Sequence, residues 1–413
     1  MQIDTDVLIV GAGIAGATLA LALGRKGYNV TLIDRLKRFQ NIPKGDFLQP
    51  VTIDILNELG VLPDISRHCA TVTKVNYGTI GGVKCFTGNY ADLDMPVNYA
   101  LNGEHRKIHE GVINAATALP NVRFYPGVNA EKLVYANGRV AGVVASSDEG
   151  TLTISCKVLV GSDGIKSKIR EQLALKYNLY PYEEKKAKMF VFTLHTATTP
   201  EAEASFYFGQ GVSCGAFPLP DNRVRVYLAL RKDLWQKIKG EGIEALQALL
   251  HSLYPRLKDE VAQIADFKQV QSVPAFYLHT PKWAVDGAVL LGDACHALSP
   301  ALGQGMNLAI QGAMELAGTL EAALSTGDYS ENTLRSYEKK RRKYVRLIQQ
   351  NSTAHTFCWF MKNAAFVKMR NAAFRRMGNC PNLLKEQMLT TSGYSDKPPS
   401  LSHLLRFAGL MKP

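Results

Sequence analysis

The chain has 413 residues, of which 46% are hydrophobic and 20% charged, which excludes general disorder and leaves room for two or three domains. The net charge of +12 suits an anionic cofactor or substrate, an acidic membrane surface or nucleic acid, but no zinc-finger spacing or basic aromatic groove supports a nucleic-acid partner. Seven single cysteines without a C-x-x-C pair argue against disulfides or a zinc site and favour a cytoplasmic location.

The N-terminal part of the chain predicts a β-α-β unit. Residues 6–10 form a short apolar run, which is typical of a buried parallel strand. A helix over 15–26 follows a glycine-rich turn, and a second strand is expected at 29–33. Helical spacing returns over 51–59 and again over 109–118.

The middle of the chain changes from this pattern to β-structure. A strand at 122–125 precedes a hairpin pair over 134–144 and 152–156, and another strand is expected at 158–160. From 188 to about 271, alternating apolar and polar residues predict an antiparallel sheet, interrupted by one helix over 242–253.

The C-terminal third returns to the earlier pattern. A strand at 288–291 precedes two long helices, over 306–324 and 331–350. The tail after Ser392 is rich in Ser, Pro and Lys, and we expect it to be loosely held.

The turn after the first strand has the spacing of a dinucleotide-binding loop. Gly11 allows a tight turn, Gly13 lets a pyrophosphate approach the backbone, and Gly16 lets the helix and strand lie close together. Asp34 ends the second strand and can accept from a ribose hydroxyl, which favours a ribose without a 2′-phosphate. This turn alone leaves FAD and NAD open.

Two further segments carry acidic residues beside glycine-rich loops. Asp163 is the first residue of the segment D-G-I-K-S-K-I-R. On its own, this segment fits an ordinary turn followed by a helix cap as well as it fits a cofactor-binding loop. Asp293 closes a strand in residues 291–307, LGDACHALSPALGQGMN, where a loop led by Pro300 runs into a helix. Such a helix start presents N–H groups and a positive dipole end to an anionic ligand.

The three segments, in this order, resemble the signatures of the FAD-dependent aromatic hydroxylases, the group A flavoprotein monooxygenases related to para-hydroxybenzoate hydroxylase. Ubiquinone-pathway hydroxylases are similar too. The resemblance implies an α/β fold: a Rossmann-like FAD-binding domain, an inserted antiparallel-sheet substrate domain and C-terminal helices. The expected domain parts are FAD-binding segments 1–75, 101–180 and 276–350, substrate-domain segments 76–100 and 181–275, and a helical tail over 351–413.

The resemblance also implies how FAD is held. Asp293 holds the ribitol hydroxyls, the Pro300 loop faces the isoalloxazine ring, and N–H groups over 303–307 face its N1–C2=O2 edge. The sequence departs from the family at Gly312, where an acid is usual, and at Lys44, where an Arg is common. The implied FAD contacts are Gly11, Gly13, Ala15, Gly16, Asp34, Arg35, Lys44, Arg106, Val128, Asp163, Asp293, Pro300, Gly303, Gly305, Met306 and Asn307.

The activity implied by the resemblance is monooxygenation. NADH or NADPH reduces FAD, O2 gives a flavin C4a-hydroperoxide, and one oxygen is transferred to an aromatic or polyketide-like small molecule. His296 and the absence of a W-x-W-x-I-P segment argue against the reductases and halogenases of this fold. An alkene epoxidase, a hydroxylase of a membrane-bound quinone precursor and a non-catalytic FAD-binding protein remain alternatives.

The sequence identifies neither the substrate nor a catalytic base, and it leaves the oligomeric state open. Arg223 and Arg225 alternate on one strand, where they either hold a carboxylate or form a solvated face. Cys295 and His296 are interpreted as structural, so no metal site is predicted. Position in the expected sheet gives the substrate-pocket candidates His195, Tyr207, Ser213, Phe217 and Tyr227.

The segment 357–377 is apolar and basic. Phe360, Ala364, Val367 and Phe374 share one face of an expected helix, with Lys368 at its border. This pattern predicts either a helix that covers the cofactor domain or a peripheral contact with an anionic membrane surface.

Overall fold

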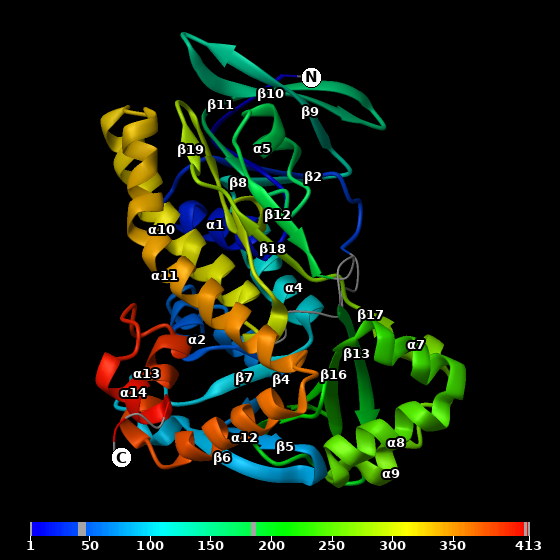
Figure 1. Cartoon of the computed structure of the whole chain (residues 1–413). Helices are drawn as coiled ribbons and strands as arrows, with labels where there is room; N and C mark the ends of the chain where they lie inside the picture. Colours follow the sequence, from blue (N-terminus) through cyan, green and yellow to red (C-terminus); the bar gives the residue numbers. More distant parts are fainter. Residues whose placement is uncertain (1, 40–46, 183–186, 409–410, 412–413) are drawn as a thin grey trace.

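The computed structural model describes residues 2–39, 47–182, 187–408 and 411. Within these ranges two large sheets lie at opposite ends of the molecule, and long helices run beside them (Figure 1). The first sheet is mainly parallel, and residues 7–10 at its centre are buried, as expected where both faces are covered. Its strands are β1 (Gln2–Val10), β2 (Val30–Asp34), β8 (Val122–Pro126), β9 (Asn129–Ala136), β10 (Arg139–Ser147), β11 (Gly150–Gly161), β19 (Ala284–Val285) and β20 (Ala288–Leu290).

The order β19-β20-β11-β1-β2-β8 places β1 at the centre, with β2 and β11 parallel on its two sides. The predicted strands at 152–156 and 158–160 are one continuous strand, β11. Residues 150–155 of β11 pair with β10 in a hairpin, and residues 153–161 run along β1. The two pairings overlap, so the strand continues without a break.

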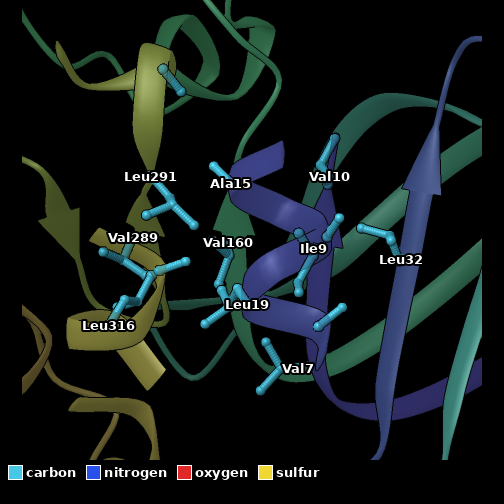
Figure 2. Close-up of a cluster of buried hydrophobic side chains, with 14 of the residues drawn as sticks. Val7, Ile9, Val10, Ala15, Leu19, Leu32, Val160, Val289, Leu291 and Leu316 are labelled. Carbon is cyan, nitrogen blue, oxygen red and sulfur yellow. The ribbon is translucent and has the colours of Figure 1, made fainter. Parts of the chain in front are cut away.

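Helices cover the parallel sheet and form its core. Every residue over 14–24 in the first helix is buried, because this helix lies between the sheet and two other helices. Figure 2 shows Leu19, Val160 and Leu316 meeting in this cluster. The helices are α1 (Ile14–Arg25), α4 (His105–Thr117), α10 (Gly305–Thr326) and α11 (Glu331–Trp359).

The second sheet has the order β17-β13-β16-β15-β14-β5-β6 and takes its strands from two separate parts of the chain. Pairing is antiparallel except between β14 and β5. The strands are β5 (Lys74–Thr79), β6 (Val83–Asn89), β13 (Ala187–His195), β14 (Glu203–Phe208), β15 (Val212–Leu219), β16 (Arg223–Arg231) and β17 (Gln271–Ser272).

One face of this sheet is covered by α7 (Lys232–Glu241), α8 (Ile243–Leu253) and α9 (Lys258–Val261). The sequence predicted a single helix here, over 242–253. The additional helix α7 is largely polar and buries only Trp235 and Ile238, which explains why its apolar pattern was weak. Gly242, with φ of +103°, separates α7 from α8.

Smaller elements accompany the two large sheets. These smaller elements include two three-stranded sheets and three short helices. They are β3 (Phe47–Leu48), β4 (Cys69–Val72), β7 (Ala100–Gly103), β12 (Asn178–Pro181), β18 (Phe276–His279), β21 (His296–Ala297), α2 (Pro50–Glu58), α3 (Leu62–Ser66) and α5 (Lys168–Gln172).

The chain ends in α12 (Ala364–Gly378), α13 (Pro381–Ser392) and α14 (Leu401–Ala408). The tail after Ser392, expected to be loose, contains α14 and is tied back by the Lys343–Asp396 ion pair at 2.9 Å. The helix α12 packs on β6 of the second sheet rather than on the first sheet. Among the described residues, no helix is both long and apolar enough to cross a membrane.

Arg370 fixes α12 to the second sheet. It is buried, and its Nη1 donates to the carbonyls of Gly209 and Cys358, each at 3.0 Å. The guanidinium also lies over the ring of Phe208.

Replacing Arg370 with methionine leaves two buried carbonyls without a donor, and we expect the free energy of unfolding to fall by about 2 kcal/mol. Chemical denaturation measures this change. The matched control is Arg375→Met on the exposed side of α12, which should stay within about 0.5 kcal/mol of the parent. Equal losses in the two variants contradict the anchoring role.

Candidate functional site

A cavity of about 870 Å³ runs from the carboxyl ends of β1, β2 and β11 to the second sheet. Ligands of open α/β sheets bind at this end of the strands. One wall is polar and glycine-rich, and the other is built of aromatic side chains. The predicted cofactor contacts that line the cavity are Gly11, Gly13, Ala15, Asp34, Arg35, Val128, Asp163, Asp293, Pro300, Gly303, Gly305 and Met306.

The glycines of the first turn differ in what surrounds them. A Cβ on Gly16 meets the Gly11 carbonyl oxygen at 2.1 Å, so Gly16 serves the packing of α1 and does not line the cavity. Gly11 has φ of +103°, and a Cβ there meets Ser162 O at 2.3 Å. A Cβ on Gly13 has no described atom within 4 Å. Gly13 therefore leaves open the space that an approaching pyrophosphate needs.

Asp34 holds the turn and also faces the cavity. Its Oδ2 accepts from the Ala12 N–H and its Oδ1 from the Leu36 N–H, both at 2.8 Å. Each carboxylate oxygen keeps a second lone pair, so Asp34 can still accept from a hydroxyl of a ligand. His109, which the sequence did not single out, supports the same turn by donating to Ala12 O at 2.7 Å.

The second segment is joined to the third by a buried arginine. Asp163 accepts from the Ser167 hydroxyl and from the Ile169 N–H, and burial raises the pKa of its carboxyl. Arg170 is 1% exposed and donates to Ala294 O at 2.8 Å and to Ile165 O at 2.9 Å. The arginine that ends the D-G-x-x-S-x-x-R segment therefore holds the two loops together.

The third segment presents the start of α10 to the cavity. Gly303 takes the left-handed conformation with φ of +61°, and the helix follows at Gly305. The side chain of the N-cap residue, Gln304, donates to Thr391 O at 2.9 Å and is directed away from the first helical N–H groups. Those N–H groups and the helix dipole thus give the cavity a positive end.

Asn307 lies behind this loop. Its Oδ1 accepts from the Gln49 N–H at 2.8 Å, and its Nδ2 donates to Phe47 O at 2.9 Å and to Gly303 O at 2.8 Å. These bonds hold the Pro300 loop against the segment that begins at Phe47. The structure gives Asn307 this bracing position outside the cavity lining.

Two further implied FAD contacts, Arg106 and Lys44, are not found among the described lining residues of the cavity, and Gly312 lies in the packing of two helices. Arg106 lies outside the cavity lining and pairs with Glu110 at 3.4 Å, while its neighbour His105 lines the cavity. Lys44 lies outside the described residues. A Cβ on Gly312 meets Tyr337 Oη at 3.0 Å, so the departure from the family pattern serves the packing of α10 on α11.

Cys295 and His296 are buried in the core behind the cavity. Burial raises the pKa of the Cys295 thiol well above its usual value and lowers that of His296 to about 3. The thiol is therefore protonated and the imidazole neutral near neutral pH. Neither is poised as a nucleophile.

The substrate-pocket candidates divide between the two faces of the second sheet. Ser213, Phe217 and Tyr227 line the cavity. The hypothesis is wrong for His195, which is exposed at the end of β13, and for Tyr207, which stacks on Tyr254 beneath the helices of the other face. Alternation along a strand shows which residues share a face, but it does not tell which face is the pocket.

Arg223 forms an ion pair outside the cavity. It donates to Glu104 at 2.6 Å and holds the pKa of that carboxyl below its usual value. Neither Arg223 nor Arg225 lines the cavity, so the structure does not place either where it could hold a substrate carboxylate.

Much of the aromatic wall comes from residues that the sequence did not single out. Tyr77 and Phe86 stack at 4.6 Å, and the C-terminal helices close the chamber with a further set of side chains. Isolated apolar residues in a helix give no signal for a cavity, because the same pattern is typical of an ordinary core. Phe374, which the sequence placed on the face of an expected helix, also lines the cavity, and the main additional lining residues are Met189, Phe206, Asn351, His355, Trp359 and Met388.

Comparisons with known proteins agree with this geometry. A family model described as an FAD binding domain matches residues 4–352. The 6-methylpretetramide 4-monooxygenase of Streptomyces rimosus is 28% identical over 384 residues, which cover 90% of each protein. The para-nitrophenol 4-monooxygenase of Pseudomonas sp. (strain WBC-3) is 24% identical over 404 residues, covering 94% of this chain and 96% of that protein.

A solved structure shows the same fold. The p-nitrophenol 4-monooxygenase PnpA from Pseudomonas putida DLL-E4 superposes with a TM-score of 0.79 at 21% identity, covering 95% of this chain and 99% of that one. The arrangement of the two sheets and the helices is therefore shared with a protein of similar length.

The different surroundings of Gly13 and Gly16 give a testable contrast. Gly13→Ala should change the unfolding free energy of the flavin-free protein by no more than about 1 kcal/mol, because the new methyl group meets only open space. It should nevertheless lower the FAD content of the purified protein. Gly16→Ala should cost about 3 kcal/mol, because its methyl group overlaps the backbone.

Denaturant titration and flavin absorbance measure the two effects separately. A Gly13→Ala protein that keeps full flavin content, or a Gly16→Ala protein of unchanged stability, contradicts this assignment.

Proposed function

This chain belongs to the FAD-dependent aromatic hydroxylases, and we propose that it hydroxylates an aromatic or polyketide-like small molecule in the cavity between its two sheets. It is an oxidoreductase, a monooxygenase with FAD as cofactor and NADH or NADPH as co-substrate. The observation that carries the proposal is the continuous cavity, which joins the glycine-rich dinucleotide wall to an aromatic chamber.

The residues at the first wall fit FAD. Gly13 leaves space for the pyrophosphate at the start of α1, Gly11 forms the tight turn before it, and Asp34 offers lone pairs to a ribose. We assign Arg35 and Val128 to the adenine end, and Asp163 and Asp293 to the pyrophosphate and ribitol. When bound, FAD supplies the electron transfer and oxygen activation of the reaction.

The chain itself contributes orientation and electrostatics. The positive end of α10 lies where the ring edge is expected and favours negative charge there. Phe206, Phe217 and Met189 give the opposite side of the cavity an apolar surface, which excludes water and orients an aromatic ring. Charged side chains among the described lining residues lie on the dinucleotide segments instead; these are Asp34, Arg35, Asp163, Lys166, Lys168 and Asp293.

Turnover tests the proposal. The FAD-loaded protein should oxidise NADH or NADPH faster when an aromatic substrate is added, and it should consume O2 and yield a product one oxygen atom heavier. Product structure separates a hydroxylated ring from an epoxide. Protein that cannot be reconstituted with FAD, or that shows no substrate-dependent O2 uptake with phenols, naphthols or anthrones, contradicts the proposal.

A second candidate, a hydroxylase of a membrane-bound quinone precursor, rests on the surface beside the cavity. Phe357, Phe366 and Met369 are 66%, 56% and 65% exposed, and Lys362 and Lys368 lie among them. We propose that this surface touches an anionic bilayer. The face predicted from sequence differs, because Phe374 points inward to Phe208 and Tyr77.

Flotation with vesicles tests the membrane contact. At low salt the protein should float with vesicles that contain phosphatidylserine, and high salt should reverse this, because the attraction between Lys side chains and lipid is screened. The double variant Phe366→Ser with Met369→Ser should stay at the bottom of the gradient. Equal flotation of parent and double variant argues against this surface.

A further inference from the structure

We propose that Asn351, His355 and Trp359, which follow one face of α11, form a hydrogen-bonding stripe that recognises an elongated, neutral aromatic substrate bearing hydroxyl or carbonyl oxygens. The inference rests on the proposed function and specifies the substrate class of the same cavity.

The spacing places the three side chains in a row. Residues four apart lie on neighbouring turns of one helix face, and all three side chains line the cavity. At a rise of 1.5 Å per residue, the row extends about 12 Å along the helix. A single six-membered ring is too short to reach both ends, so the row matches a ligand with several fused or linked rings.

Two side-chain nitrogens of the stripe have no hydrogen-bond partner within the described residues. Asn351 Nδ2 and Trp359 Nε1 are buried without an acceptor. Among the described residues, the His355 ring makes an edge-on contact with Tyr77, with ring centres 5.8 Å apart. Buried polar groups are normally hydrogen-bonded, because a buried group without a partner loses its hydrogen bonds to water and gains none in the protein, which costs free energy. The residues line the cavity, so we infer that a ligand supplies the missing partners once the Asn351 amide and the Trp359 indole turn toward it.

The stripe is held beside the loop that faces the flavin. Ser352 Oγ donates to Ser299 O at 2.7 Å, and Thr356 Oγ1 bonds Ser299 Oγ at 2.5 Å. Ser299 directly precedes Pro300, so the next face of α11 is fixed to the start of that loop. Oxygens bound on the stripe therefore orient a ligand relative to the reacting ring.

The chemistry of the stripe defines what it can bind. The indole N–H only donates, the amide N–H donates, and a neutral imidazole both donates and accepts. Burial lowers the pKa of His355 to about 4, so the ring is neutral near pH 7. Phe374, Met377 and Phe276 surround the row with apolar surface. This setting favours neutral hydroxyl or keto groups over a carboxylate, whose charge would lack a counter-ion.

Binding of a matched pair of probes tests the central residue. Equilibrium dialysis of the oxidised, FAD-loaded protein measures the Kd of β-naphthol and of naphthalene, which differ only in a hydroxyl group. The parent should prefer β-naphthol by about tenfold. His355→Phe should abolish this preference and leave the Kd of naphthalene unchanged, and His355→Gln should restore part of it. The control His195→Phe, away from the cavity, should behave as the parent.

The ends of the stripe are tested with emodin, a three-ring molecule that bears keto and hydroxyl oxygens. Asn351→Leu and Trp359→Phe should each weaken emodin several-fold and leave naphthalene unaffected. A β-naphthol preference that survives in His355→Phe overturns the inference, as does an equal loss of naphthalene affinity or the absence of probe binding to the parent. Failure of the proposed function is distinct, because it appears as absent flavin or absent O2 uptake in the parent itself.

Discussion

The close approach of α1 to the strand ends is the constraint on which the site depends. Gly16 lies so near the Gly11 carbonyl, and Gly11 so near Ser162, that neither position has room for a side chain. This contact aims the first N–H groups of α1 at the cavity. It also brings the loop after β11, which carries Asp163, beside the first turn. Segments separated by 150 residues of chain thus share one ligand surface because two glycines allow their backbones to touch.

A small number of buried polar side chains extends this arrangement to the third segment. Arg170 joins the Asp163 loop to Ala294, and Asn307 joins the Pro300 loop to Phe47 and Gln49. Both would be costly to bury alone, but each is satisfied by backbone groups of the loop it supports. The second and third segments that the sequence singles out are therefore hydrogen-bonded to each other, and the third is also fixed to the chain at Phe47 and Gln49.

The cofactor wall could be anticipated from sequence because its features are local. A turn, a strand end or a helix start is encoded within a few neighbouring residues, as with Gly13, Asp34 and Gly305. The aromatic wall of the cavity could not be anticipated in the same way. Its residues depend on which face of the second sheet is covered by the helices α7, α8 and α9. Ser213 and Tyr207 belong to equally alternating strands, and only the tertiary structure separates them. Asn307 and Gly16 show a further limit: a motif residue can support a site without lining it.

The helix α11 runs unbroken for 29 residues, about 44 Å, from the parallel sheet to the aromatic chamber. Near its beginning, Glu338 accepts from the Trp283 N–H at 2.8 Å and pairs with Arg342, and near its end His355 and Trp359 line the cavity. The side chains that α11 contributes to the chamber are therefore positioned by the same helix that packs against the edge of the parallel sheet.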